Sequence, residues 1–184
     1  GWSERAYDPA RRSAFPPPLA RLAADLAAAA CGAELRAEAA IVNFYGASAA
    51  MGGHRDDAEA YQDAPIVSIS LGLDAVYLIG GETKEVAPTA IRLRSGDVVV
   101  QGGHSRGYYH GVPRVLAGTA PPSLRRAAAG DAELLAVCAW LEGHRINLNV
   151  RQCFEEVQQE ATAETEPGGG AAPADREPPS RVDS

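Results

Sequence analysis

Apolar residues near the start of the chain recur at helical spacing, three or four positions apart. The recurring positions are Leu19, Leu22, Ala23 and Leu26. Pro18 precedes them and Gly32 follows them, and these residue types are typical of the first turn and of the position just past a helix. The pattern predicts a helix over residues 19–31, after an irregular arm formed by residues 1–16.

From residue 39 onwards the period of the apolar positions changes. Short β-rich runs are separated by glycine pairs and acidic turns, which is typical of an all-β sandwich or barrel. The predicted strands cover residues 40–45, 65–71, 76–79, 90–94, 97–100, 106–112 and 145–153. Residues 114–130, rich in Pro, Ala and Gly, are predicted to form a loop. A second helix is predicted over residues 131–142, with Asp131 as its N-cap and Gly143 just past its end.

Length and composition indicate one globular domain. The chain has 184 residues, and its 19 glycines and 13 prolines favour many turns over a helical bundle. Because no apolar stretch is long enough to cross a membrane and no signal peptide is found, we expect a soluble, intracellular protein of the nucleus, cytoplasm or mitochondrion. Three cysteines without CxxC spacing argue against a disulfide framework and a zinc ribbon, so we expect buried, reduced thiols at Cys31, Cys138 and Cys153.

The charge balance bears on possible partners. The net charge is −7, and −4 of it lies in residues 159–184, which are rich in Glu, Pro, Gly and Ala and are predicted to be disordered. A nucleic-acid-binding protein usually has a basic footprint, and the overall composition of this chain lacks one. Two local pairs of arginines, Arg11/Arg12 and Arg125/Arg126, are the candidates for a basic patch.

The first candidate for chemistry is the triplet His54-Arg55-Asp56. Residues at positions i and i+2 of an extended segment point the same way, so an imidazole and a carboxylate converge on one point. The neighbouring Gly52 and Gly53 leave space for a ligand to approach the backbone. A solvated loop is the ordinary alternative for such a triplet, and the triplet alone does not decide between them.

A third metal ligand has to come from elsewhere, and the chain has four histidines. His110 lies in a strand-like run and is the best candidate. Two histidines and one carboxylate form the facial triad of non-haem iron(II) oxygenases, which leaves positions for a cosubstrate and O2. Zinc is the competing metal, but structural zinc sites usually have four ligands and often thiolates. His104 is better explained as a loop histidine, and His144 as a residue at the edge of the last strand.

The last predicted strand alternates strictly between apolar and polar residues. Its polar face consists of Arg145, Asn147, Asn149 and Arg151. A solvated outer face is the usual explanation, but such faces mostly mix Lys, Glu and Thr. Two cations with amides between them suit a dianion, because arginine holds carboxylates with paired donors. The two arginines lie about 20 Å apart along an extended strand, and 2-oxoglutarate has a carboxylate at each end. Asn43 and Tyr45, which share a strand face, either donate to the same diacid or are ordinary strand residues.

Together these motifs resemble the AlkB family of Fe(II)/2-oxoglutarate-dependent dioxygenases, and most closely its first eukaryotic homologue. The pattern is N-x-Y, H-x-D nine residues after the Tyr, P-I-V-S-I-S-L-G, S-G-D-V-V, S-R-x-x-x-H-x-V-P-R and R-x-N-x-x-x-R. These motifs lie at Asn43/Tyr45, His54/Asp56, residues 65–72, 95–99 and 105–114, and Arg145/Asn147/Arg151. The resemblance extends from about Trp2 to Gln152.

The resemblance implies a mainly β fold with flanking helices, built on a double-stranded β-helix (jelly-roll) core over residues 17–158. It implies Fe(II) held by His54, Asp56 and His110, with no further catalytic side chain. It also implies 2-oxoglutarate, used with O2, held by the polar residues of the two strands: Asn43, Tyr45, Arg145, Asn147 and Arg151.

The implied activity is oxidative removal of methyl groups from N-methylated bases of tRNA or DNA, with release of formaldehyde, succinate and CO2. A base within a helix has to be flipped out to reach the metal. Residues 1–16 resemble the end of a nucleotide-recognition lid, in which Trp2 and Tyr7 stack on the base, and residues 159–184 form an acidic tail. We expect a monomer that binds nucleic acid and no membrane. The same chemistry on a protein or small molecule is the alternative, followed by a jelly-roll binding module that has lost catalysis.

Overall fold

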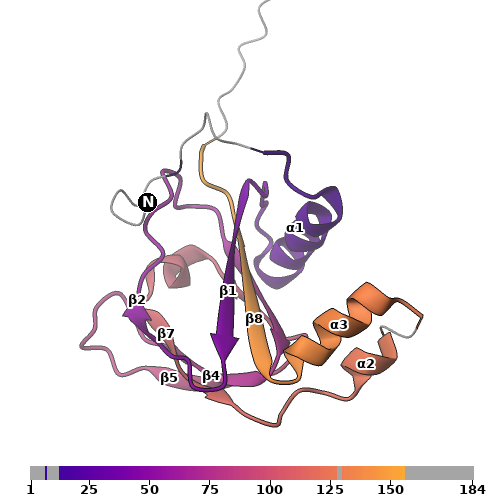
Figure 1. Cartoon of the computed structure of the whole chain (residues 1–184). Helices are drawn as coiled ribbons and strands as arrows, with labels where there is room; N and C mark the ends of the chain where they lie inside the picture. Colours follow the sequence, from indigo (N-terminus) through magenta and orange to yellow (C-terminus); the bar gives the residue numbers. More distant parts are fainter. Residues whose placement is uncertain (1–6, 8–12, 128–129, 156–184) are drawn as a thin grey trace, which may run out of the picture.

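Two four-stranded antiparallel sheets form the body of the molecule, and a computed structural model describes residues 7, 13–127 and 130–155 (Figure 1). In the first sheet the strand order is β1 (Ala39–Gly46), β8 (His144–Arg151), β3 (Ile66–Gly72) and β6 (Val98–Gln101). In the second it is β2 (Met51–His54), β7 (His110–Leu116), β4 (Asp74–Ile79) and β5 (Thr89–Leu93). Except for the β4–β5 hairpin, each strand is followed by one in the other sheet. This is the predicted jelly-roll, and the prediction is confirmed.

A hydrophobic cluster joins the inward faces of the two sheets. Tyr45 of β1 packs there with Ala75 and Tyr77 of β4 and with Val112 and Val115 of β7. The alternation of the strands decides which residues enter this space, because every second side chain points inward. The polar face of β8 also points inward: Arg145, Asn147 and Arg151 are buried. The solvated outer face considered from the sequence is therefore wrong for this strand.

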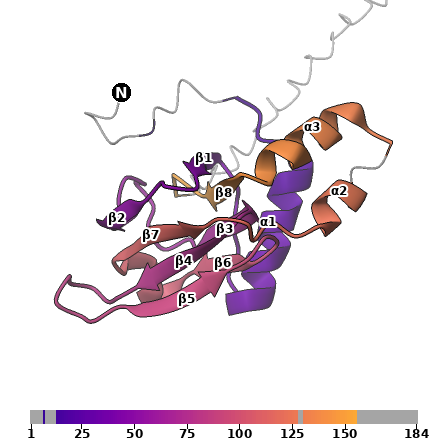
Figure 2. The same ribbon diagram turned by 60° about the horizontal axis from the view of Figure 1, so that its bottom comes forward.

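Helices cover the outer side of the first sheet, as Figure 2 shows from a second direction. Helix α1 (Pro17–Cys31) begins two residues before the predicted start. Prolines are tolerated in the first turn, because the backbone N–H groups there make no hydrogen bond within the helix. It ends at Gly32, whose φ of 66° is the left-handed conformation that glycine adopts without strain. Its buried Ala23 and Ala27 pack against Val67 of β3 in a second hydrophobic cluster. None of the helices in the described ranges has the length and apolar character that a membrane crossing needs.

The second predicted helix is confirmed as α3 (Ala132–Leu141), and the side chain of its N-cap Asp131 accepts a hydrogen bond of 2.9 Å from the Leu134 amide. The predicted loop over residues 114–130 is wrong in two places. Strand β7 extends to Leu116, because Val115 fills the core on its inner face, and residues Ser123–Ala127 form a short helix, α2.

The predicted strand over residues 106–112 also begins too early. Residues Gly103–Gly107 form a 3-10 segment, η2, and β7 starts only at His110. Arg106 is buried there because its guanidinium group binds the buried carboxylate of Glu59, and it is not part of a strand. Strand β2 was not predicted, because its glycine pair hides the alternation. Of the three free cysteines, Cys138 and Cys153 are buried as expected, whereas Cys31 is exposed.

Candidate metal centre

Three ligands of the predicted metal site meet where β2 ends and β7 begins. His54 is the last residue of β2 and His110 the first of β7, and the two are directly paired across the strands. Their ring centroids lie 4.4 Å apart. Asp56 follows two residues after His54, and one ligand atom from each of the three residues lies within 4.8 Å of the others. The spacing of H-x-D and the β2–β7 pairing thus bring the three side chains together.

Close approach of the two strands depends on Gly111, next to His110. A Cβ atom at this position would lie 3.0 Å from the carbonyl oxygen of Met51 and 3.1 Å from that of Gly52. Contacts this short require the neighbouring backbone to move, and here the neighbour is the strand that carries His54. A glycine after the second histidine therefore allows the pairing that defines the site.

Backbone carbonyls orient both imidazoles. Nδ1 of His54 lies 3.0 Å from the Gly52 oxygen, and Nδ1 of His110 lies 3.1 Å from the Tyr108 oxygen. A carbonyl only accepts, so each Nδ1 carries the proton and each Nε2 keeps its lone pair for a metal. The Nε2 atoms face Asp56, at 3.9 Å for His54 and 3.7 Å for His110. Burial lowers the pKa of His110, which favours the neutral imidazole that metal binding requires.

A buried cluster of charged side chains (the ion cluster), formed by Arg151, Glu59 and Arg106, holds Asp56 in place. Arg151 donates from Nη2 to Asp56 Oδ2 at 3.2 Å and from Nη1 to Glu59 Oε1 at 2.5 Å. Glu59 also accepts a 2.9 Å bond from Arg106 Nη2, and its side chain has no exposed surface. Burial alone would raise the pKa of Glu59, but the two guanidinium groups hold it below its usual value. Glu59 is therefore a buried carboxylate ion shared by two cations.

Arg106 also fixes the backbone that carries Asp56. Its Nη1 donates to the Asp56 carbonyl oxygen at 2.5 Å, and its Nε donates to the Ala64 oxygen at 3.1 Å. All three guanidinium nitrogens thus bind the segment between β2 and β3. Neither Glu59 nor Arg106 was assigned a role from the sequence. Glu59 lies in the acidic run after the triplet, which resembles a solvated loop, and Arg106 was placed in a strand.

Buried hydrogen-bond donors without a partner lie in the space between the sheets. Arg145 has 1% of its surface exposed, and only Nη2 is engaged, by Ser70 Oγ at 2.8 Å. Within the described residues, Nε and Nη1 of Arg145, Nε of Arg151 and the Tyr77 hydroxyl have no partner. Buried cationic donors without acceptors are costly, by about 1–3 kcal/mol or more per group. Such donors fit an anion with several oxygens, and a dicarboxylate has four.

The remaining predicted diacid ligands lie on β1, which pairs with β8, and on β8 itself. Tyr45 is paired with Arg145 across β1 and β8, and Asn43 is paired with Asn147. The Tyr45 hydroxyl has only a weak acceptor, Met51 Sδ at 3.7 Å, so it is available to a better one. Asn147 donates from Nδ2 to Ser68 Oγ at 2.7 Å, which orients its amide against β3.

Comparison with known proteins places this site in a family. The family model described as the 2OG-Fe(II) oxygenase superfamily matches residues 1–151. The chain belongs to this superfamily. Its members are oxygenases that use Fe(II) and 2-oxoglutarate, with O2, and the His-Asp-His group and the unpartnered cationic donors fit both. The resemblance to AlkB proteins that the motifs indicated is confirmed by relatives named AlkB and ALKBH1A.

Two curated relatives and one solved structure illustrate the similarity. The chain is 41% identical over 161 residues to the DNA N(6)-methyladenine demethylase ALKBH1A of Arabidopsis thaliana, over 83% of this chain and 46% of that protein. It is 37% identical over 163 residues to the N6-methyladenosine RNA demethylase ALKBH of Cryphonectria parasitica, over 82% and 70%. The structure of OsALKBH1 superposes with a TM-score of 0.62 at 31% identity, over 76% of this chain and 65% of that chain. The chain spans about half the length of the Arabidopsis relative.

The other residues singled out in the sequence lie outside the oxygenase centre or outside the described residues. His104 is exposed in η2, as expected for a loop histidine. His144 is the first residue of β8, as expected for the edge of the last strand, and its ring stacks on that of Trp140 with a centroid distance of 3.9 Å. The Tyr7 hydroxyl donates to Glu59 Oε1 at 3.2 Å, which ties Tyr7 to the ion cluster. The predictions for Trp2, for Arg11 and Arg12, for the side chain of Arg125 and for residues 159–184 fall on parts that the structure does not describe.

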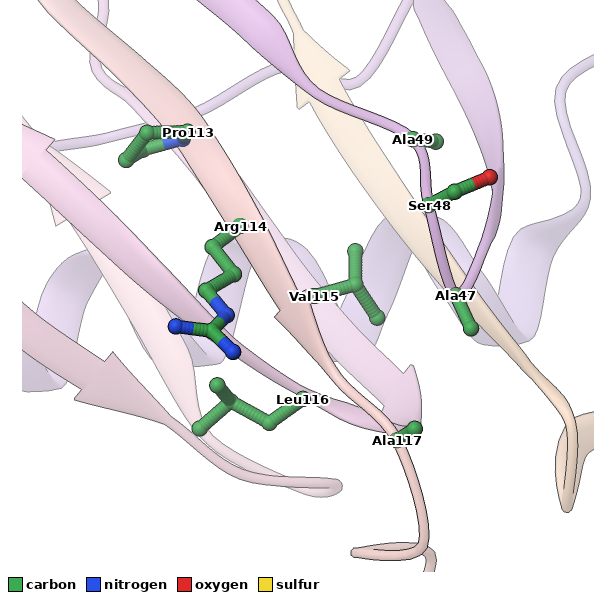
Figure 3. A pocket seen from close by; sticks show the side chains of 8 residues that line it. All are labelled: Ala47, Ser48, Ala49, Pro113, Arg114, Val115, Leu116 and Ala117. Atoms are coloured by element: carbon green, nitrogen blue, oxygen red, sulfur yellow. The ribbon is translucent and has the colours of Figure 1, made fainter.

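Two clefts lie along β7, and one of them adjoins the oxygenase centre. A cleft of about 510 Å³ next to His110 is lined mainly by Gly52 and Gly53 of β2, the β4–β5 loop and Tyr109. Arg55 and Lys84 lie over the Tyr109 ring, at 5.2 and 5.4 Å from its centroid. Figure 3 shows the other cleft, of about 480 Å³, between Ala47–Ala49 and the far end of β7. It contains none of the metal ligands, so we assign it no part in the chemistry.

Proposed function

We propose that this chain is the catalytic core of a 2-oxoglutarate-dependent dioxygenase that removes methyl groups from N-methylated bases of nucleic acid. One observation carries the proposal: two imidazoles and a carboxylate converge beside a buried arginine with two unpartnered donors. The names of the relatives support the substrate class, since they describe demethylases of DNA and of RNA. The products are formaldehyde from the methyl group, with succinate and CO2 from the cosubstrate.

Each residue of the centre has a defined task in this proposal. His54, Asp56 and His110 hold Fe(II), and the bound iron with 2-oxoglutarate and O2 supplies the oxidising power. Arg145, oriented by Ser70, binds one carboxylate of the diacid. The remaining diacid ligands are Asn43, Tyr45, Asn147 and, through its free Nε, Arg151. Tyr45, Arg145, Asn147 and Arg151 are buried, which excludes water, so the protein contributes position and a dry environment.

The substrate is proposed to approach from the side of the Tyr109 cleft. Arg55 and Lys84 place two cations there, and phosphate contacts by such residues supply most of the affinity for nucleic acid. A base flipped out of its helix would then reach the metal centre, with Trp2 and Tyr7 as candidate stacking residues. In this proposal residues 1–16 end a lid, 17–158 form the core and 159–184 form an acidic tail of a monomeric protein.

The test follows succinate and formaldehyde release with methylated and unmethylated oligonucleotides of tRNA and DNA sequence. We expect formaldehyde only from the methylated substrates. His110→Ala should abolish turnover with little change in circular dichroism, whereas the exposed His104→Ala should retain it. Full activity of His110→Ala would refute the ligand assignment. Mass spectrometry of the nucleosides before and after the reaction identifies the base.

A second candidate function has one observation in its favour. The net charge of −7 is unusual for a protein that binds nucleic acid tightly. The same centre would then hydroxylate or demethylate a protein or small molecule. Succinate release that no oligonucleotide increases, but that a protein or metabolite fraction does, would favour this candidate over the first.

A further inference from the structure

Tyr77 presents a buried hydroxyl that the family motifs do not explain. It lies in the middle of β4, on the face that points between the sheets, and has 6% of its surface exposed. Its ring centroid is 5.9 Å from that of His110, at an interplanar angle of 35°. No donor or acceptor within the described residues reaches its hydroxyl. All the motif residues assigned to iron or diacid lie on other strands or on the segment after β2.

A hydroxyl in this position is unfavourable unless something binds it. The other members of the same hydrophobic cluster are apolar apart from Tyr45, and phenylalanine would fill the same volume without a polar atom. Leaving a buried hydroxyl without a partner carries the full penalty of removing it from water. Buried polar groups in folded proteins almost always have partners, so an orphan next to a candidate site calls for a ligand.

The surroundings of Tyr77 indicate what kind of ligand this is. The other orphan groups between the sheets are guanidinium donors of Arg145 and Arg151, so the shared partner is an acceptor with several oxygens. A tyrosine hydroxyl keeps its proton at neutral pH, because its ordinary pKa is about 10, so Tyr77 acts as a donor to such an acceptor.

We propose that Tyr77 is a further binding residue for the dicarboxylate cosubstrate, to which its hydroxyl donates a hydrogen bond from the sheet opposite Arg145. The inference rests on the proposed function, because it uses the same diacid. It adds a donor from the second sheet to a site whose other assigned ligands all come from β1 and β8. The diacid would then be held from both sheets, which fixes its position relative to the two histidines of the second sheet.

The first test is the stability of the metal-free protein without cosubstrate. Tyr77→Phe removes a polar atom that has no partner, so the melting temperature should stay unchanged or rise. Tyr61→Phe is the matched control, because Tyr61 packs against the other hydrophobic cluster, away from the diacid site. A clear fall in the melting temperature for Tyr77→Phe would show that its hydroxyl has a partner within the protein, and would overturn the inference.

The second test is 2-oxoglutarate binding measured by calorimetry on the Mn(II)-loaded full chain under anaerobic conditions. A hydrogen bond to a charged group predicts that Tyr77→Phe raises the Kd about tenfold or more. The affinity for Mn(II) itself should not change, and Tyr61→Phe should bind like the wild type. A Kd for Tyr77→Phe equal to that of the wild type would overturn the inference.

The two proposals fail in different ways. If the wild type with Mn(II) binds no 2-oxoglutarate, the proposed function is wrong. If the wild type binds it and Arg145→Met does not, while Tyr77→Phe binds normally, the diacid site stands and only the role of Tyr77 is wrong. Loss of affinity in Tyr77→Phe with undiminished stability supports both.

Discussion

Glu59 offers the sharpest test of the physical reasoning about this site. Its side chain is fully buried and binds Arg151 at 2.5 Å and Arg106 at 2.9 Å. Glu59→Ala removes the counter-charge from two buried guanidinium groups and leaves them with unpaired donors. Breaking a buried ion pair by removing one partner costs about 3–5 kcal/mol. Since one carboxylate serves two cations here, we expect a loss at the upper end of that range.

Urea denaturation of the metal-free protein measures this loss. At a slope of about 2 kcal/mol per molar urea, a loss of about 4 kcal/mol lowers the midpoint by about 2 M. Glu59→Gln keeps the shape but removes the charge and turns an amide donor towards a guanidinium group, so we expect an intermediate loss. Glu34→Ala, at an exposed position, is the control and should change the unfolding free energy by less than about 0.5 kcal/mol.

A loss below about 1 kcal/mol for Glu59→Ala would refute the reasoning, because that is the effect of an exposed pair. A double-mutant cycle then separates the ion pair from packing. Arg106→Met is less harmful in the Glu59→Ala background than alone if the two side chains interact. Additive effects of the two substitutions would mean that the pair contributes no coupling energy.

Three further predictions follow from individual residues. Burial lowers the folded-state pKa of His110 below its ordinary 6.5, so between the two pKa values the unfolded chain binds more protons than the folded one. The unfolding free energy should therefore decrease as the pH falls below about 6.5, until the folded-state pKa is reached. Denaturation midpoints measured over this pH range should not show this decrease for His110→Gln. Arg145→Met should leave the melting temperature of the metal-free protein unchanged or higher, and should weaken 2-oxoglutarate binding in calorimetry by about 100-fold. Gly72→Ala should lower the unfolding free energy by more than about 2 kcal/mol in urea, because φ is +87° and a Cβ would collide with the His144 carbonyl. Gly96→Ala, with φ of +94° and open space around it, should lose only the conformational part, about 1 kcal/mol.

Much of this centre could be predicted from the sequence because its pattern is local or periodic. His54 and Asp56 share a direction through their spacing, and the alternation of β8 predicted one polar face for Arg145 and Arg151. The pattern could not say that this face is buried, because burial depends on the second sheet and on partners far along the chain. The composition of the face, two arginines and two amides, was the signal that favoured the interior.

The roles of Glu59 and Tyr77 could not be predicted from the sequence. Glu59 has its partners 47 residues ahead, at Arg106, and 92 residues ahead, at Arg151. Nothing near it in sequence distinguishes it from the exposed Asp57 and Asp63. Tyr77 lies in an apolar run in which a tyrosine is an ordinary core residue. Only the three-dimensional neighbours reveal that one carboxylate is shared by two cations and that one hydroxyl lacks a partner.

The same neighbours explain how the two halves of the centre keep their relative position. The histidines come from the second sheet, whereas Arg145 comes from the first. The segment from Asp56 to Ala64 passes from one sheet to the other, and Glu59 within it binds Arg106, just before β7, and Arg151, at the end of β8. The ion cluster therefore ties the metal side to the diacid side. For this reason, loss of Glu59 should weaken metal and diacid binding together, whereas loss of Arg145 should weaken diacid binding alone.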